Sequence, residues 1–157
     1  MRSKPANIRL TSVLLAALLA IAAACDRGPR VAIVAPNGST LATVKIEIAD
    51  TPQSQELGLM YRDSLASDAG MLFMFAEPSH QVFWMKNTRI PLDMLFADGQ
   101  RRVIGIVANA EPYSEARLSV PGDSQYVLEV NGGFCQRRGV KAGDRLDFLG
   151  FTPSPKS

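Results

Sequence analysis

Residues 92–107 read LDMLFADGQRRVIGIV, and this stretch decides the class of fold. Two runs rich in apolar residues, Leu92–Ala97 and Arg101–Val107, flank the dipeptide Asp98-Gly99. An Asp-Gly pair between two such runs is a strong signal for a tight hairpin turn. The stretch therefore predicts two antiparallel strands joined by a short loop.

Similar short runs on both sides of this hairpin indicate more strands. In residues 43–48 polar and apolar side chains alternate, as they do in a half-buried strand. The spacing predicts about seven strands in some 110 residues, so the expected fold is mainly β, a compact single-domain β-sandwich or barrel-like fold. The remaining strands are expected at Met71–Phe75, Gln81–Lys86, Gln125–Val130 and Arg145–Leu149.

One short helix is expected near residues 52–62. Thr51 is a favoured N-cap residue, and Pro52 suits the first helical position. A further single helical turn is expected at residues 133–138. The longer helix is expected to bury three side chains, Leu57, Met60 and Tyr61.

Several motifs carry a family resemblance. They are Glu56–Arg62 (ELGLMYR), Gly70–Phe75 (GMLFMF), Phe83–Thr88 (FWMKNT), Ile90–Asp93 (IPLD), Val127–Gly132 (VLEVNG) and Gly139–Arg145 (GVKAGDR). In this combination, the chain resembles the domain of unknown function 192 family across most of its length, from Leu41 to Gly150. The resemblance implies a small, mostly β, single-domain protein of a kind often exported or lipid-anchored in bacteria. It implies no reaction, because the family has no agreed activity.

The first 24 residues have the features of a lipoprotein signal peptide. Three basic residues precede the apolar run Val13–Ala24, which is shorter than the roughly 20 residues that a membrane-spanning helix needs. Ile21–Cys25 (IAAAC) then resembles a bacterial lipobox, in which the cysteine receives diacylglycerol. Ordinary signal cleavage after the same alanines is the alternative, because they also satisfy the A-x-A rule.

These features predict a location. Lipidated Cys25 would anchor the chain to a membrane, and Asp26 resembles the inner-membrane retention signal of Gram-negative lipoproteins. We therefore expect the protein at the periplasmic face of the bacterial inner membrane, or in the soluble periplasm if Cys25 is not lipidated. The expected organisation is a signal peptide at 1–24, a tether at 25–39 that could include a strand at Val31–Val34, a β domain at 40–151 and a flexible tail at 152–157.

Charge and cysteine use restrict the partners. Removal of residues 1–24 changes the formal net charge from +2 to −1, because this segment contains three basic residues and no acidic one. The rest of the chain shows no basic stripe of the kind that binds nucleic acid, so we expect a monomer without a nucleic-acid partner. We interpret Cys135 as a small buried hydrophobe rather than a nucleophile, because the single histidine, His80, would have to be its base.

Candidate ligand-binding residues are concentrated between Trp84 and Asp93. Period-two alternation places Trp84 and Lys86 on one strand face. If the two strands pair through the intervening turn, Asp93 joins them close to Asn87, and Arg62 at the end of the helix could complete the group. An indole beside a lysine–aspartate pair could hold a small polar ligand. The structural alternative is that these side chains seal a second layer and pair at its rim.

The expected function is a non-catalytic binding or accessory module for a small polar ligand or an envelope protein, with no cofactor and no metal. The alternative is a small periplasmic hydrolase that uses Asp93 with Lys86 or His80. Carboxylates for glycoside hydrolysis could come from Asp93, Glu111 or Glu129, but the sequence does not place any two of them in one cleft. We interpret five methionines as core filler rather than as a Cu(I) site: Met60, Met71, Met74, Met85 and Met94.

Overall fold

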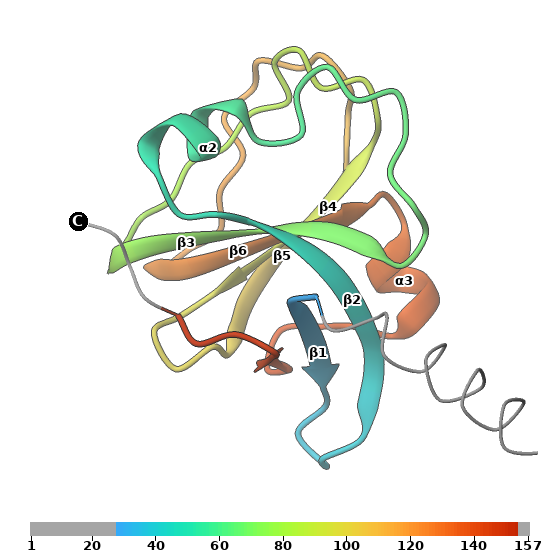
Figure 1. The fold of residues 1–157 in the computed structure, drawn as a ribbon, viewed down its shortest axis with the longest axis vertical. Helices are drawn as coiled ribbons and strands as arrows, with labels where there is room; N and C mark the ends of the chain where they lie inside the picture. The colour runs from blue at the N-terminus through green and yellow to red at the C-terminus, as the bar shows by residue number, and fades with distance from the viewer. Residues whose placement is uncertain (1–27, 154–157) are drawn as a thin grey trace, which may run out of the picture.

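The computed structural model describes residues 28–153, which form one seven-stranded sheet and two short helices (Figure 1). The strand order in the sheet is β5-β4-β6-β3-β2-β1-β7. The predicted mainly β, single-domain, barrel-like fold is thereby confirmed. The elements are β1 Arg30–Val34, β2 Thr40–Ala49, α2 Pro52–Leu57, β3 Ala69–Ser79, β4 Leu92–Ala97, β5 Val103–Ala110, β6 Ser124–Asn131, α3 Phe134–Arg138 and β7 Arg145–Leu149.

The sheet curls until its two edge strands meet at one corner. Neighbouring strands are antiparallel except for the parallel pair β2 and β3. At the corner, an isolated bridge joins Arg102 to Arg145, and the Val103 amide donates to the Asp144 carbonyl at 2.8 Å. A strongly twisted sheet of this size closes on itself most easily by such a partial barrel.

Both faces of the sheet are buried, and period-two alternation assigns the side chains to them. In β4, Leu92, Met94 and Phe96 belong to one apolar cluster and Leu95 to the other. The second of these clusters also contains residues of β1 and β7, so it fills the inside of the curl. The first lies on the outer face, which α2 and the long loops cover (Figure 1).

The helix begins where the sequence predicts but ends earlier. Thr51 caps it, and its hydroxyl accepts a hydrogen bond from the Ser54 amide at 3.2 Å. The prediction of a helix to residue 62 is wrong, because Gly58 adopts a positive φ of 47° and ends it after one and a half turns. Leu57 and Tyr61, expected to be buried, are therefore exposed, and Leu59 is the side chain that packs into the outer cluster.

Two further boundaries differ from the predictions. Residues 81–86 form no strand, and within the described chain only an isolated bridge between Phe83 and Leu118 remains there. The reason is that β4 already pairs with β5 and β6, so this segment crosses over the sheet and cannot join it. The strand that the sequence allows at Val31–Val34 is present as β1, which lies between β2 and β7 with Val31 and Ile33 in the core, so the sheet begins before residue 40.

Asp93 is the one polar residue of β4, and its role is structural. It is fully buried and faces the inside of the curl, away from the outer cluster. One carboxylate oxygen accepts the amides of Asn109 at 2.8 Å and Gly133 at 2.9 Å, and the other accepts the Cys135 amide at 2.8 Å. These bonds fasten the end of β5 and the first turn of α3 to the sheet.

Replacement of this carboxylate is therefore expected to destabilise the whole domain. Asp93→Ala leaves three backbone donors without a partner, and an unpaired buried donor costs about 1–3 kcal/mol. We expect the free energy of unfolding to fall by about 3–5 kcal/mol in chemical denaturation. Asp123→Ala, at an exposed aspartate before β6, is the control and should change it by less than about 0.5 kcal/mol. Equal stability of the two variants would contradict this assignment.

Candidate functional site

Three loops lie over the outer face of the sheet, and backbone hydrogen bonds hold them together. In the central loop, residues 80–91, Phe83 exchanges two bonds with Leu118 of the loop after β5: it donates to Leu118 at 2.8 Å and accepts from it at 2.9 Å. On its other side, the Tyr61 amide donates to the Asn87 carbonyl at 2.9 Å. Backbone pairing of this kind fixes the course of a loop without help from a strand.

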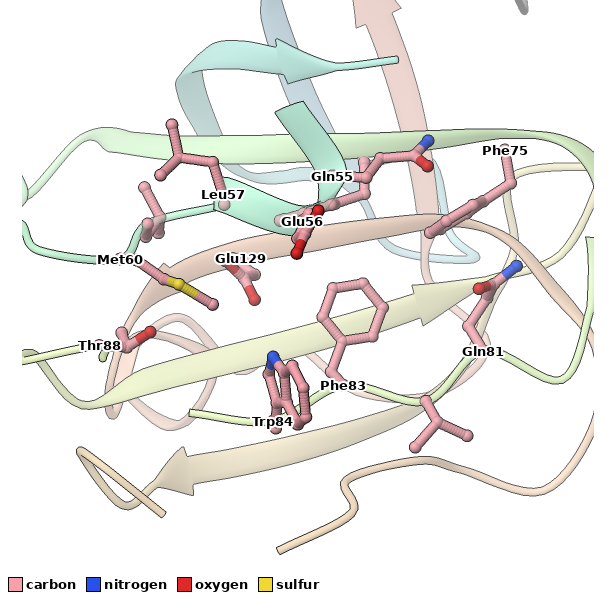
Figure 2. Close-up of a pocket in the computed structure, with 14 residues that line it drawn as sticks. Gln55, Glu56, Leu57, Met60, Phe75, Gln81, Phe83, Trp84, Thr88 and Glu129 are labelled. Carbon is pink, nitrogen blue, oxygen red and sulfur yellow. The ribbon is translucent and has the colours of Figure 1, made fainter. Parts of the chain in front are cut away.

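A pocket of about 160 Å³ lies between these loops and the sheet (Figure 2). Its walls are mostly aromatic and aliphatic, and its polar groups come from α2, the central loop and β6. Figure 2 shows Glu56, Met60, Phe83, Trp84 and Glu129 arranged around the same space. The lining residues are Gln55, Glu56, Leu57, Gly58, Leu59, Met60, Phe73, Phe75, Gln81, Val82, Phe83, Trp84, Thr88 and Glu129.

Glu129 is the buried polar group of this pocket. It is 4% exposed and stands in β6 directly between Met71 of β3 and Met94 of β4. Among residues 28–153 no hydrogen bond or ion pair to its carboxyl group is found. Because burial disfavours the charged form, the pKa of Glu129 is raised to about 8. An acid of this kind is largely protonated at neutral pH.

Phe83 and Trp84 form the wall opposite α2. Phe83 packs edge-on against Phe73, Phe75 and Phe96, with ring centroids 5.0, 6.4 and 5.7 Å apart. Trp84 is 49% exposed and separates the pocket from a wider surface groove. The tightly packed Phe83 therefore makes the inner wall rigid, and the indole stands at the entrance.

Three of the five predicted ligand-binding residues lie together in this groove, which has a volume of about 440 Å³. Lys86 places its ammonium 5.3 Å from the centre of the Trp84 ring. Asn87 has a positive φ of 56°, and its side chain donates to the Tyr61 hydroxyl at 2.9 Å.

The other two predicted site residues lie elsewhere. Arg62 forms a two-point ion pair with Glu47 of β2, with N–O distances of 2.5 and 2.7 Å. The hydrogen bond from this guanidinium lowers the pKa of Glu47. Asp93 faces the inside of the curl, so the predicted meeting of Asp93 with Trp84 and Lys86 is wrong. The cause is the false strand at residues 81–86, on which that geometry depended.

The hydrolase alternative has no support in this arrangement. Asp93 has both oxygens occupied by backbone amides. His80 is exposed in the loop after β3, with its ring 3.4 Å from the Gly122 carbonyl. Cys135 is buried, and burial together with the neighbouring Asp93 carboxylate raises the pKa of its thiol. A thiol of this kind is a poor nucleophile.

The methionines are packed as the sequence predicts. Met71, Met85 and Met94 belong to the outer apolar cluster, and Met74 belongs to the inner one. Met60 is partly buried at the pocket wall. Among the described residues, no group of three or more His, Cys, Asp or Glu side chains is placed to hold a metal ion.

No helix in residues 28–153 is long and apolar enough to span a membrane.

The curled sheet and its loop-covered pocket define a small, single-domain, mainly β protein. The chain belongs to the DUF192 family, described as "Uncharacterized ACR", whose model matches residues 32–148. The family resemblance of the sequence motifs is thereby confirmed. None of the curated proteins compared matches the chain.

Two solved structures are similar to this one. The first, from Sinorhizobium meliloti, is described as a "putative transcription regulator"; it shares 43% identity, covers 78% of this chain and 95% of its own, and has a TM-score of 0.74. The second, a protein of unknown function from Novosphingobium aromaticivorans, shares 41% identity, covers 75% of this chain and 83% of its own, and has a TM-score of 0.71. Both confirm the fold, and neither description supplies a reaction.

Glu129 is the site residue that reasoning from sequence missed. The sequence offers it only as one of several carboxylates for glycoside hydrolysis. A signal was nevertheless present: Glu129 lies in the apolar run Val127–Val130 and shares a strand face with Val127. A lone acid at a core position of a strand is uncommon unless it has a partner or a task.

The raised pKa of Glu129 predicts a specific dependence of stability on pH. The folded state keeps a proton on Glu129 up to about pH 8, whereas the unfolded chain releases it near 4.5, the ordinary pKa of a glutamate side chain. The contribution of Glu129 to stability is thus greatest below pH 4.5 and falls as pH rises to 8, by up to about 1.4 kcal/mol per pH unit. Glu129→Gln removes this contribution, so the difference in unfolding free energy between wild type and variant should follow this slope.

Urea denaturation at half-unit pH steps from 5 to 8.5 measures that difference. Glu111→Gln makes the same chemical change at an exposed glutamate outside the pocket, and it should run parallel to wild type. A wild-type minus Glu129→Gln difference that is flat across this range would show that the carboxyl group is not held in its neutral form.

Proposed function

We propose that this protein is a non-catalytic binding module that holds a small polar ligand in the pocket above Glu129. One observation carries the proposal: a carboxyl group is nine-tenths buried, lacks a partner among the described residues, and opens into a small cavity. A buried polar group without a partner costs free energy, on the order of 1–3 kcal/mol. A ligand that supplies the missing hydrogen bond or charge recovers that cost.

The surroundings of Glu129 favour binding over catalysis. General acid–base catalysis needs a second polar group positioned against the reacting atom. The neighbours of Glu129 in the sheet are Met71 and Met94. The second carboxylate of the pocket, Glu56, is exposed on α2, and among residues 28–153 no hydrogen bond fixes it. Apolar walls with few polar groups are typical of a site that orients a ligand.

The same proposal places the module at the periplasmic face of the inner membrane, anchored through lipid on Cys25. The lipobox-like sequence and Asp26 support this location. The short distance to the fold supports it as well, since β1 begins at Arg30, five residues after Cys25. Five extended residues span roughly 16–18 Å, so an anchored domain would stay next to the bilayer.

Ligand binding is tested by purification from the native host. The full chain, extracted in non-ionic detergent, should retain a small molecule detectable by mass spectrometry after denaturation. Trp84→Ala opens the entrance of the pocket and should reduce its recovery at least fivefold. Tyr113→Ala removes an exposed aromatic ring that does not line the pocket, and recovery should match wild type. Equal recovery from both variants, or loss of a bound envelope protein instead of a small molecule, would contradict the proposal.

The anchor is tested by fractionation. Wild-type chain should sediment with inner membranes and have the mass of a lipidated chain that begins at Cys25. Cys25→Ser removes the thiol that accepts the diacylglycerol. The variant should carry no lipid mass and should no longer sediment with inner membranes as a lipidated protein. Ser39→Ala, at an exposed position before β2, serves as the control. A wild-type protein without added lipid mass, released with the soluble periplasm, would refute the anchor.

A further inference from the structure

We infer that the ligand of this pocket is an organic ammonium ion, held by the Glu129 carboxylate at the base and by the aromatic rings of the walls. The inference rests on the proposed function and specifies its ligand class. The charge, the aromatic walls and the size of the pocket support it.

The charge of the pocket is one-sided. Its lining contains two acids, Glu129 and Glu56, and no lysine, arginine or histidine. From α2 the Glu56 carboxylate faces the cavity, and from the central loop the polar lining includes Gln81 and Thr88. The sheet neighbours of Glu129 in β3 and β4 are methionines. A ligand that brings its own positive charge therefore meets no cationic side chain among the described residues that line this pocket and can pair with the Glu129 carboxylate.

The walls suit a cation better than a neutral hydroxyl compound. Phe73, Phe75, Phe83 and Trp84 all line the cavity. Aromatic faces attract cations through the ring quadrupole, and ammonium groups are recognised in cages built of such rings. A neutral ligand would gain only contact area from them. Lys86 lies over Trp84 at 5.3 Å from the side of the outer groove, so within residues 28–153 the rings of this pocket without a side-chain cation of their own are Phe73, Phe75 and Phe83.

The size of the cavity limits the ligand. A volume of about 160 Å³ corresponds to roughly five water molecules at about 30 Å³ each. A methylated ammonium head of about five non-hydrogen atoms fills such a space, with the rest of the molecule extending past Trp84 into the groove. Entry of the cation should be coupled to loss of the Glu129 proton, because a nearby positive charge favours the carboxylate.

The chain carries its own reporter for the test, because Trp84 is its single tryptophan. Fluorescence of the purified full chain in non-ionic detergent is titrated with choline and with 3,3-dimethylbutan-1-ol, which has the same shape without the charge. We expect choline to bind at least tenfold more tightly at pH 8. Its Kd should fall about tenfold per pH unit from 5.5 to 7.5, as one proton is displaced, and level off above about pH 8.

Two variants distinguish the effect of the Glu129 charge on binding from an effect on folding. Glu129→Gln should weaken choline binding at pH 8 at least tenfold and remove its pH dependence, while binding of the neutral alcohol changes less than threefold. Glu111→Gln should behave as wild type. The choline-to-alcohol comparison in the wild type needs no variant, so it remains decisive if Glu129→Gln folds poorly. Glycerophosphocholine tests whether the ammonium group belongs to a lipid headgroup or to a small soluble molecule. Binding as tight as that of choline assigns a lipid headgroup, and binding tenfold weaker assigns a soluble ammonium compound.

The inference fails if the two isosteres bind equally, if choline binding survives Glu129→Gln, or if choline does not bind at all. Equal binding of the isosteres leaves the proposed function intact, because the pocket then holds ligands without using charge. The same holds if the native protein carries an uncharged molecule that the Trp84→Ala variant does not retain. The proposed function then stands, and the ammonium inference fails. The proposed function fails by a different result: the Trp84→Ala variant would then retain as much small molecule as the wild type, or neither protein would retain any.

Discussion

The sheet is apolar on both faces, and each face must therefore be covered. Strands β3, β4 and β6 contribute alternate side chains to two clusters, one on each side. The curl of the sheet buries the inner cluster together with α3, which contributes Phe134 and Cys135. The outer cluster depends on α2 and three loops, which cannot join the sheet because β4 and β6 already have two neighbours each. These loops cross the sheet and bond to one another, and the pocket is the space left beneath them.

This constraint explains why one acid stands out. The alternation that supplies Val127 to the outer cluster also supplies Glu129, two residues later on the same face. Elsewhere on this face the corresponding positions carry Met71, Phe73 and Met94, which contribute apolar area. A carboxyl group here opposes the local rule for a buried strand and costs stability. Positions at which a sequence breaks its own folding rules are those where function is expected.

The sequence predicted features that depend on local chemistry and failed on features that depend on neighbours. The Asp98-Gly99 turn and the Thr51 cap are formed by adjacent residues, and both are present. The segment around Phe83 has the composition of a strand, but β-propensity describes a half-buried surface, which a loop packed on a sheet also provides. Asp93 was assigned to a ligand because its partners, backbone amides 16 to 42 residues away, leave no pattern in the sequence.

The way in which the loops are fixed also bears on how the pocket could vary. Bonds between backbone groups, such as those joining Phe83 to Leu118 and Tyr61 to Asn87, do not depend on which side chains the loops carry. Tyr61 and Asn87 both adopt positive φ values. Asparagine tolerates this conformation, but for Tyr61 it costs about 1–2 kcal/mol and persists only where the surroundings impose it. The walls are thus held by the main chain, whereas their chemistry resides in the side chains. Exchange of lining residues can therefore change the ligand without refolding the loops, which allows one curled sheet to serve different partners through the same cavity.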